Sequence, residues 1–263
     1  MRDLVIIGAG PGGLSAAIYA VRYKLDFLII GKEIGGAINK AQLIENYLGL
    51  KPINGKDLVG LFKEQINYFK IKIIEEDVTK IEKIKNYFVV YYESNRIETK
   101  NIILAFGLNI RKKIPGEEKF IGKGVSYCVS CDAPLYRNLN VAVIGKNDIN
   151  LLKKYASRVY SLKNIKEIKG DTVVNKIILE DNKEIKVDGV FLEEKISSQI
   201  LIKDLKIKLD KNNLVIVDDN FSTNIKGIYC VGDLCSKSII KQFSVAIGQG
   251  AIASYSIYKK IKN

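Results

Sequence analysis

Histidine is absent from the sequence, and this absence excludes several kinds of active site. A Ser-His-Asp triad, a histidine general base, a haem iron held by histidine and a histidine-ligated zinc ion are all impossible in this chain. Proton transfer must therefore fall to Asp, Glu, Cys, Tyr, Lys or a cofactor. Zinc would need all four cysteines. We expect no metal site, because Cys230 lies in an apolar strand where a small buried residue suffices.

A long, uninterrupted hydrophobic run is missing as well. Residues 4–21 carry no charge, but Pro11 and several glycines interrupt them, which is unfavourable in a spanning helix and atypical of a signal peptide. We therefore expect no membrane association and a cytoplasmic protein. Thiols stay reduced in that compartment, so the cysteines should be catalytic or incidental, and not structural disulfides.

Acidic residues are outnumbered: 42 Lys and Arg stand against 29 Asp and Glu, a net charge of +13. Such a surplus suits an acidic partner, but lysines spread over every solvated face would give the same total. The basic residues do not gather on one arm or helix, so we expect no nucleic-acid binding. With 47% hydrophobic residues in 263, the chain can bury a core and is not a disordered class.

Apolar segments and helical patterns alternate along the chain, which predicts an α/β fold with βαβ units. We expect strands at 4–7, 27–30, 71–74, 87–92, 102–105, 141–144, 214–217 and 227–231. Helical patterns cover 13–23, 62–69 and 243–258, the last rich in small residues. Short hairpins are expected over 167–190. Residues 114–116, Ile-Pro-Gly, break the pattern and suggest a linker.

The first glycine-rich turn carries the chemistry of a dinucleotide site. Gly8, Gly10 and Gly13 follow a strand and open a helix, in the G-x-G-x-x-G spacing that lets pyrophosphate approach the backbone at a helix N-terminus. Glu33 stands about 20 residues later, where an acidic residue holds a ribose hydroxyl. A second signal is the Gly232-Asp233 pair at the end of strand 227–231. Both predict a bound dinucleotide.

Cys128 and Cys131 are separated by two residues, a spacing that allows a small, rapidly exchanging disulfide ring. Asp132 follows directly, either as a helix cap or as the acid that protonates a leaving thiolate. The alternative is half of a metal site with Cys230 and Cys235, which we disfavour. We expect plain packing for Cys230.

In this order, the motifs resemble those of the low-molecular-weight thioredoxin reductases, flavoproteins with two dinucleotide-binding domains. The matching segments are 7–13, 31–36, 45–49, 104–107, 124–132, 232–233 and 241–242. The resemblance implies a Rossmann-like FAD domain split into residues 1–115 and 218–263. A smaller, truncated second Rossmann-like domain, residues 116–217, would be inserted between them and carry the cysteine pair. Family members are usually homodimers.

The resemblance also assigns roles to residues. Cys131 would face the flavin, Cys128 would attack the partner's disulfide, and Asp132 would donate the proton. Asn46 would lie near the isoalloxazine ring, and Asp233 would hold the ribityl chain. The implied FAD positions are Gly8, Gly10, Pro11, Gly12, Gly13, Gly31, Glu33, Gly36, Asn46, Gly107, Gly232, Asp233, Lys241 and Gln242.

The second domain departs from the family pattern. After strand 141–144 the sequence reads Gly145-Lys-Asn-Asp-Ile-Asn150, so bulky side chains replace the second and third glycines and Asp148 would repel a pyrophosphate. The family's basic motif for the 2′-phosphate of NADPH has no counterpart. Residues 138–217 are also short for a dinucleotide domain, which takes on the order of 100 residues or more. Ala37 and Ala133 replace a usual glutamine and glycine.

These departures predict an electron donor other than NADPH. The leading hypothesis is a disulfide reductase that takes electrons from ferredoxin, an acidic carrier that a +13 protein would attract, and passes them through FAD and the Cys128–Cys131 pair to thioredoxin or a glutaredoxin-like protein. A thiol oxidase running in the reverse direction uses the same residues. A conventional NAD(P)H enzyme with an atypical nucleotide site and a non-catalytic flavin-bearing interaction module remain as further alternatives.

Overall fold

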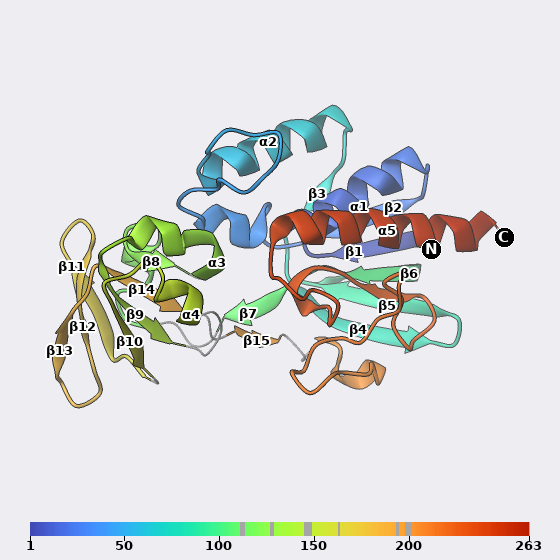
Figure 1. The fold of residues 1–263 in the computed structure, drawn as a ribbon. Helices are drawn as coiled ribbons and strands as arrows, with labels where there is room; N and C mark the ends of the chain where they lie inside the picture. Colours follow the sequence, from blue (N-terminus) through green and yellow to red (C-terminus); the bar gives the residue numbers. More distant parts are fainter. Residues whose placement is uncertain are drawn as a thin grey trace. The chain divides into compact units, whose positions relative to one another are not determined.

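A computed structural model describes residues 1–110, 114–126, 129–144, 149–162, 164–192, 195–197 and 201–262 (Figure 1). The chain divides into two compact units. The first unit comprises Met1–Asn39, Leu58–Asn109 and Ser197–Asn263, and the second comprises Lys40–Asp57 and Ile110–Ile196. Each unit is described by itself below.

A seven-stranded sheet forms the centre of the first unit, in the order β3-β2-β1-β6-β5-β4, with β16 paired to β6. The strands are β1 (Arg2–Ile7), β2 (Phe27–Ile30), β3 (Ile73–Ile74), β4 (Val78–Ile84), β5 (Tyr87–Tyr92), β6 (Asn95–Leu104) and β16 (Ile228–Cys230). β6 has three neighbours: it runs antiparallel to β5 over its first half and parallel to β1, and its last residues also run parallel to β16. β3, β2, β1, β6 and β16 are therefore parallel neighbours, which confirms the predicted α/β fold class.

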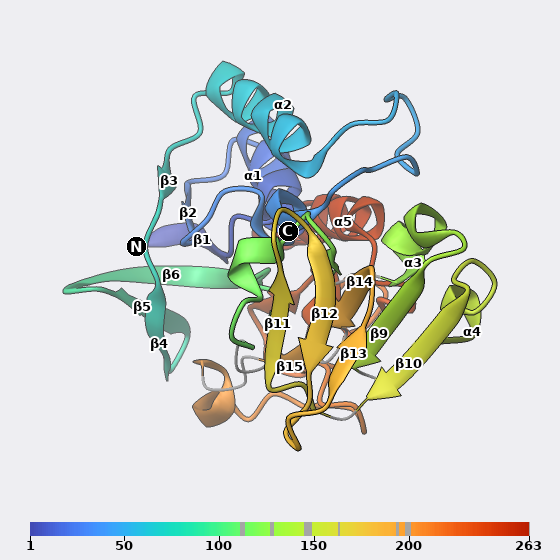
Figure 2. The same cartoon turned by 90° about the vertical axis from the view of Figure 1, so that its left-hand side faces the viewer.

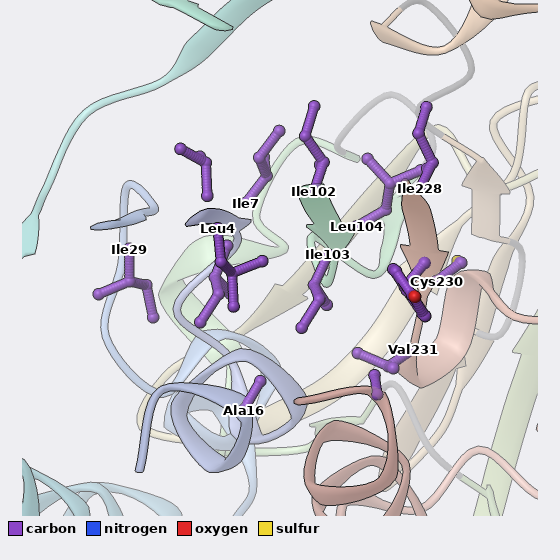
Figure 3. Close-up of a cluster of buried hydrophobic side chains, with 14 of the residues drawn as sticks. Leu4, Ile7, Ala16, Ile29, Ile102, Ile103, Leu104, Ile228, Cys230 and Val231 are labelled. Atoms are coloured by element: carbon purple, nitrogen blue, oxygen red, sulfur yellow. The ribbon is translucent and has the colours of Figure 1, made fainter. Parts of the chain in front are cut away.

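The parallel strands bury near-continuous apolar runs, as expected for a sheet covered on both faces. Figure 3 shows Leu4 and Ile7 of β1, Ile103 of β6 and Ile228 of β16 in one cluster with Ala16 of the first helix. The side chains of Leu4, Ile103 and Ile228 are fully buried. This core fixes the strands that end at the candidate site.

Two helices, α1 (Pro11–Arg22) and α5 (Phe243–Lys262), lie side by side on this sheet (Figure 1). The hydroxyl of Ser254 donates to the Ala16 carbonyl and that of Ser15 to the Ile247 carbonyl, both at 2.7 Å. A Cβ at Gly250 would lie only 2.1 Å from the Gly12 carbonyl oxygen. The small residues of the tail helix are therefore explained by the close approach of α1. A third helix, α2, spans Gly55–Tyr68.

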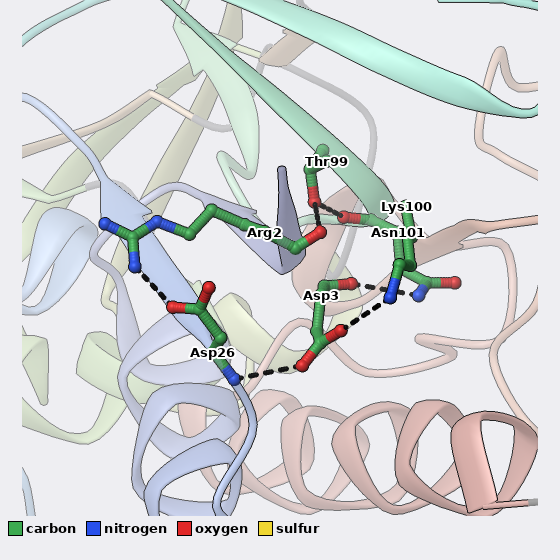
Figure 4. A network of polar contacts seen from close by, with 6 residues as sticks. All are labelled: Arg2, Asp3, Asp26, Thr99, Lys100 and Asn101. Atoms are coloured by element: carbon green, nitrogen blue, oxygen red, sulfur yellow. Dashed lines mark hydrogen bonds and ion pairs between the residues drawn. The ribbon is translucent and has the colours of Figure 1, made fainter.

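Polar side chains tie together the amino ends of β1, β2 and β6 (Figure 4). Arg2 forms an ion pair with Asp26, and the Asp3 carboxylate accepts hydrogen bonds from the Asp26 backbone N–H at 3.2 Å and from Lys100 at 3.1 Å. Thr99 donates to the Asn101 carbonyl at 2.9 Å. Exposed ion pairs of this kind contribute roughly 0–1 kcal/mol each, so the network aligns this edge more than it stabilises the fold.

The second unit contains a parallel sheet in the order β10-β9-β14-β8 and an antiparallel sheet of three strands (Figure 2). The parallel strands are β8 (Val125–Ser126), β9 (Asn140–Ile144), β10 (Arg158–Leu162) and β14 (Gly189–Leu192). The antiparallel strands are β11 (Glu167–Gly170), β12 (Val174–Ile178) and β13 (Glu184–Lys186), which confirms the hairpins predicted over 167–190. Two short helices are α3 (Val129–Asp132) and α4 (Ile149–Leu152).

The remaining elements are brief. β7 (Leu108–Ile110) pairs with β15 (Lys195–Ser197). The 3₁₀ turns are η1 (Gly36–Lys40), η2 (Glu118–Phe120), η3 (Ala133–Tyr136), η5 (Lys203–Leu205) and η6 (Gly232–Leu234).

Three expectations from the sequence need correction. The suspected linker at 114–116 is packed: Ile114 is 8% exposed, and the Pro115 carbonyl accepts a hydrogen bond from the Ile168 N–H at 2.9 Å. The predicted strand 214–217 forms only isolated bridges at Val215, because its polar turn residues bond locally. The two units also differ from the predicted domain boundaries, since 40–57 groups with the second unit and 197–217 with the first. The second difference follows from packing: Leu205, Val215 and their neighbours are buried in the core of the first unit.

Candidate functional site

Glycines follow the carboxyl ends of four neighbouring parallel strands in the first unit. Gly31 follows β2, Gly8 follows β1, and Gly232 comes two residues after β16. Gly107 comes three residues after β6. The strand ends are tied to one another, because the Gly8 N–H donates to the Ile30 carbonyl at 2.7 Å and the Ala105 N–H to the Ile7 carbonyl at 2.8 Å. In open α/β sheets, ligands bind at this carboxyl edge.

The loop between β1 and α1 leaves no room for side chains at two of its glycines. Gly8 has a φ of +111°, and a Cβ there would lie 2.5 Å from the Ala105 carbonyl group. A Cβ at Gly13 would lie 1.9 Å from the Gly8 carbonyl oxygen. Gly8 thus permits the tight turn, and Gly13 permits close packing of helix and strand.

The N-terminus of α1 is open in a way that fits a phosphate. Gly10 is its N-cap residue, makes no side-chain capping bond, and would place a Cβ in open space. Pro11 begins the helix, and its first turn holds no acidic residue. The first backbone N–H groups of a helix lack intrahelical acceptors and favour an anion. The residues present therefore fit the pyrophosphate of a dinucleotide such as FAD.

Two further predicted cofactor residues stand at this edge. Glu33 is exposed and lies two residues after Gly31, and its carbonyl accepts a hydrogen bond from the Gly36 N–H at 3.2 Å. A Cβ at Gly36 would come within 3.4 Å of the Gly10 Cα. The segment 31–36 therefore lies directly against the glycine loop. Asn46 belongs to the second unit.

The Gly232-Asp233 pair is held by a buried polar network that the sequence did not predict. The Gly232 N–H donates to Oε1 of Gln249 at 2.7 Å, and the Ser238 hydroxyl donates to the Gly232 carbonyl at 2.7 Å. Gln249 Nε2 donates to the Ser238 Oγ at 2.9 Å. Lys241 donates to the Asp233 carbonyl at 2.8 Å. Gln249 could have been noticed as a polar residue among small and apolar ones in the tail helix.

In the second unit, Asp132 is a buried carboxyl group. It is 4% exposed, and its Oδ2 accepts a 2.7 Å hydrogen bond from the hydroxyl of Ser126, which is 1% exposed. Its other oxygen, Oδ1, is buried and has no hydrogen-bond partner in the part of the chain that the structure describes. Burial raises the pKa of Asp132 above its ordinary value, and the Ser126 hydrogen bond opposes this rise. Burial thus shifts the equilibrium of this carboxyl toward its protonated form.

Tyr136, one turn after Asp132, is also buried. Burial, together with the nearby charge of Asp132, raises the pKa of Tyr136 to about 12, against a hydrogen bond with Gln42 that lowers it. The ring packs edge-on against Phe191, with centroids 4.9 Å apart. Tyr136 is therefore a neutral, fixed wall near the carboxyl group. Neither it nor Ser126 was identified from the sequence.

The predicted cysteine pair lies largely outside the described residues. Cys128 is not described, and Cys131 lies within α3 with its side chain not described. Cys230 and Cys235 are fully buried, and burial raises the pKa of both thiols. A raised pKa disfavours the thiolate, so these two cysteines are poor nucleophiles. In the described part of the chain, no group of three His, Cys, Asp or Glu residues is placed to hold a metal ion.

The second unit repeats the strand-turn-helix start in a reduced form. β9 and β10 are parallel neighbours, but α4 between them has four residues, whereas α1 has twelve. The predicted departures at Gly145 and Asp148 lie outside the described residues. None of the described helices is both long and apolar enough to cross a membrane.

Comparison with known proteins identifies the family. The pyridine nucleotide-disulphide oxidoreductase family matches residues 2–147 and 152–250. A thioredoxin reductase from Ureaplasma parvum is 43% identical over 148 residues, which are 56% of this chain and 48% of that protein. The chain thus spans about half the length of this relative.

Two solved structures match nearly the whole chain. A thioredoxin reductase from Streptococcus pyogenes has a TM-score of 0.88 at 30% identity, covering 100% of this chain and 98% of that one. A ferredoxin-flavin thioredoxin reductase from Clostridium acetobutylicum has a TM-score of 0.63 at 32% identity, covering 99% and 98%. The chain therefore belongs to the pyridine nucleotide-disulphide oxidoreductase family, as an FAD-binding, thioredoxin reductase-like disulfide oxidoreductase.

Proposed function

We propose that the chain reduces a disulfide of thioredoxin or a glutaredoxin-like protein through the Cys128–Cys131 pair, with ferredoxin as the electron donor. FAD would be held in the first unit by the glycine loop 8–13 at the α1 N-terminus, by Glu33 at a ribose hydroxyl and by Asp233. When bound, FAD supplies the electron pair that reduces the Cys128–Cys131 disulfide.

The exchange chemistry then belongs to the chain's own residues. The Cys128 thiolate attacks one sulfur of the acceptor disulfide, which breaks that S–S bond and forms a mixed disulfide. The Cys131 thiolate attacks Cys128 in turn, so the two cysteines are oxidised to a disulfide and the acceptor leaves as a dithiol. Each departing acceptor thiolate needs a proton, and Asp132 would deliver one and be reprotonated from solvent.

The buried carboxyl of Asp132 is the observation that carries this proposal. A carboxyl group in contact with water at neutral pH holds no proton to donate. Asp132 is 4% exposed, its pKa is raised by burial, and its Oδ1 has no partner. It follows Cys131 directly in α3. These properties suit a general acid for thiol–disulfide exchange better than a helix cap.

The choice of ferredoxin has four supports. The described part of the second unit's crossover helix, α4, has four residues, against twelve in α1, whose N-terminus fits a pyrophosphate. The sequence 145–150 lacks the later glycines. The net charge of +13 would speed encounter with an acidic carrier. A solved relative, 32% identical, is named as a ferredoxin-flavin thioredoxin reductase.

The reaction of Cys128 with the acceptor disulfide is tested by trapping the mixed disulfide between the two proteins. Cys131→Ser keeps the attacking thiol and removes the resolving one, so the reduced variant should accumulate a mixed disulfide with thioredoxin, visible as a shifted band on a non-reducing gel. Cys128→Ser is the matched control and should trap nothing. Trapping by both variants, or by neither, contradicts the assignment of the two cysteines.

The thiol oxidase is a second candidate, because the same residues could run the exchange in reverse and the shortened second unit does not select a direction. Steady peroxide formation from dithiols in air would favour the oxidase. In that case, reduced ferredoxin would fail to drive acceptor reduction.

A further inference from the structure

The polar network around Gly232 is buried. Gln249 and Ser238 are each 4% exposed, and neither faces solvent that could replace its hydrogen bonds. A buried side-chain amide costs stability unless its donors and acceptor are used. Here the amide oxygen and one amide N–H are both used, on the backbone of Gly232 and on the hydroxyl of Ser238. The buried amide of Gln249 therefore makes specific hydrogen bonds to Gly232 and Ser238.

The network fixes both peptide groups of one residue. The N–H of Gly232 is bound by Gln249, and its carbonyl is bound by Ser238. Gly232 has a φ of +76°, a conformation that other residues rarely adopt. A Cβ at this position would come no closer than 3.8 Å to a neighbour, so the backbone conformation, and not crowding, is what requires glycine here. The two hydrogen bonds hold this conformation and so aim the following residue, Asp233.

The same network links the two halves of the cofactor edge. Gln249 is on α5, whose neighbour Gly250 would place a Cβ 2.1 Å from the Gly12 carbonyl oxygen of the glycine loop. Ser238 lies in the segment between Asp233 and Lys241, and Lys241 donates to the Asp233 carbonyl at 2.8 Å. Through the adjacent residues Gln249 and Gly250, α5 therefore connects the Gly232-Asp233 turn after β16 with the glycine loop at the start of α1.

We infer that Gln249 and Ser238 are positioning residues for FAD, which hold the Gly232 peptide so that Asp233 meets the cofactor at the carboxyl edge of the sheet. This inference rests on the proposed role of Asp233 within the proposed function. Neither residue needs to touch the cofactor, and the hydrogen bonds that they make are to the protein's own backbone.

The test measures FAD dissociation from the purified holoenzyme, by flavin fluorescence on serial dilution. Gln249→Ala should raise the dissociation constant about tenfold, the scale of one or two buried hydrogen bonds, and Ser238→Ala should do so by a similar factor. Gln249→Glu keeps the acceptor for Gly232 but loses the donor to Ser238, so it should fall between wild type and Gln249→Ala. Gln65→Ala, an exposed glutamine of α2, is the matched control and should not change the constant.

Positioning and stability effects separate in a second measurement. Replacing a purely structural residue would lower the melting temperature, with little change in the FAD dissociation constant or in the visible circular dichroism of the bound flavin. Replacing a positioning residue would change the dissociation constant and the circular dichroism. Ser238→Thr retains the hydroxyl and should rescue most of the affinity. An unchanged dissociation constant in both Gln249→Ala and Ser238→Ala would overturn the inference. A wild-type protein without FAD would instead refute the proposed function itself.

Discussion

Removing the hydroxyl of Ser126 should expose how much the buried carboxyl of Asp132 depends on it. Ser126 donates at 2.7 Å to Oδ2 of Asp132, and Oδ1 has no hydrogen-bond partner among the described residues. Ser126→Ala therefore leaves a buried carboxyl with both oxygens unpartnered, which costs about 1–3 kcal/mol in the free energy of unfolding. That is a large fraction of the stability of a typical domain.

The cost should depend on pH with a defined sign. The Ser126 hydrogen bond lowers the pKa of Asp132 against the effect of burial, so it favours the charged form. The loss caused by Ser126→Ala should therefore be larger at pH 8.5 than at pH 5, where the carboxyl more readily holds a proton. Urea denaturation followed by circular dichroism at both pH values measures it.

A double-mutant cycle isolates the interaction energy between the side chains of Ser126 and Asp132. Ser126→Ala, Asp132→Asn and the double variant should give a coupling energy of roughly 1 kcal/mol or more, because the two side chains are in direct contact. Asp171→Asn, an exposed turn residue of the same unit, is the control. A loss below about 0.5 kcal/mol for Ser126→Ala at both pH values would refute the geometry on which the proton donor rests.

Three further predictions follow from burial and close contact. Burial raises the pKa of Asp132 above 3.8, so folding favours the protonated form, and the contribution of Asp132 to stability falls as the pH rises through its pKa in the folded protein. Asp132→Asn should therefore be more stable than wild type at pH 8 and equally or less stable at pH 4. Thermal unfolding at the two pH values measures this difference. Gly13→Ala should abolish FAD retention, since its Cβ would lie 1.9 Å from the Gly8 oxygen, while Gly60→Ala in α2, with no atom within 4 Å, should keep a full complement of flavin by absorbance; equal flavin content would contradict this. Cys230 and Cys235 should resist iodoacetamide in the folded protein and react once it is unfolded, as read by mass spectrometry; rapid labelling of the folded state would show that they are not packing residues.

The first unit was largely predictable because its signals are local. The alternation of apolar segments and the spacing of Gly8, Gly10 and Gly13 indicate β1, α1 and β2 directly, and the close contact of Gly13 with the Gly8 carbonyl lies within this short segment. Helix ends were not predicted: the pattern at 62–69 covers only the second half of α2, which begins at Gly55 and already buries Leu58 and Val59 in its first turns.

Long-range hydrogen bonds carry no such signal. Gln249 reaches Gly232 across 17 residues, and Ser126 and Asp132 belong to two different elements, β8 and α3, so neither partner can be chosen from spacing. The segment 201–217 was assigned to the wrong unit for a similar reason: its apolar residues Leu205 and Val215 pack into a core formed by distant strands.

The most direct test of the central claim is an anaerobic titration of the purified flavoprotein, followed by its flavin absorbance. We expect reduced ferredoxin to bleach the flavin and to drive thioredoxin reduction, at a rate that falls as ionic strength rises, while NADPH and NADH leave the spectrum unchanged. Rapid bleaching by either pyridine nucleotide would contradict the account and restore a conventional NAD(P)H-dependent enzyme.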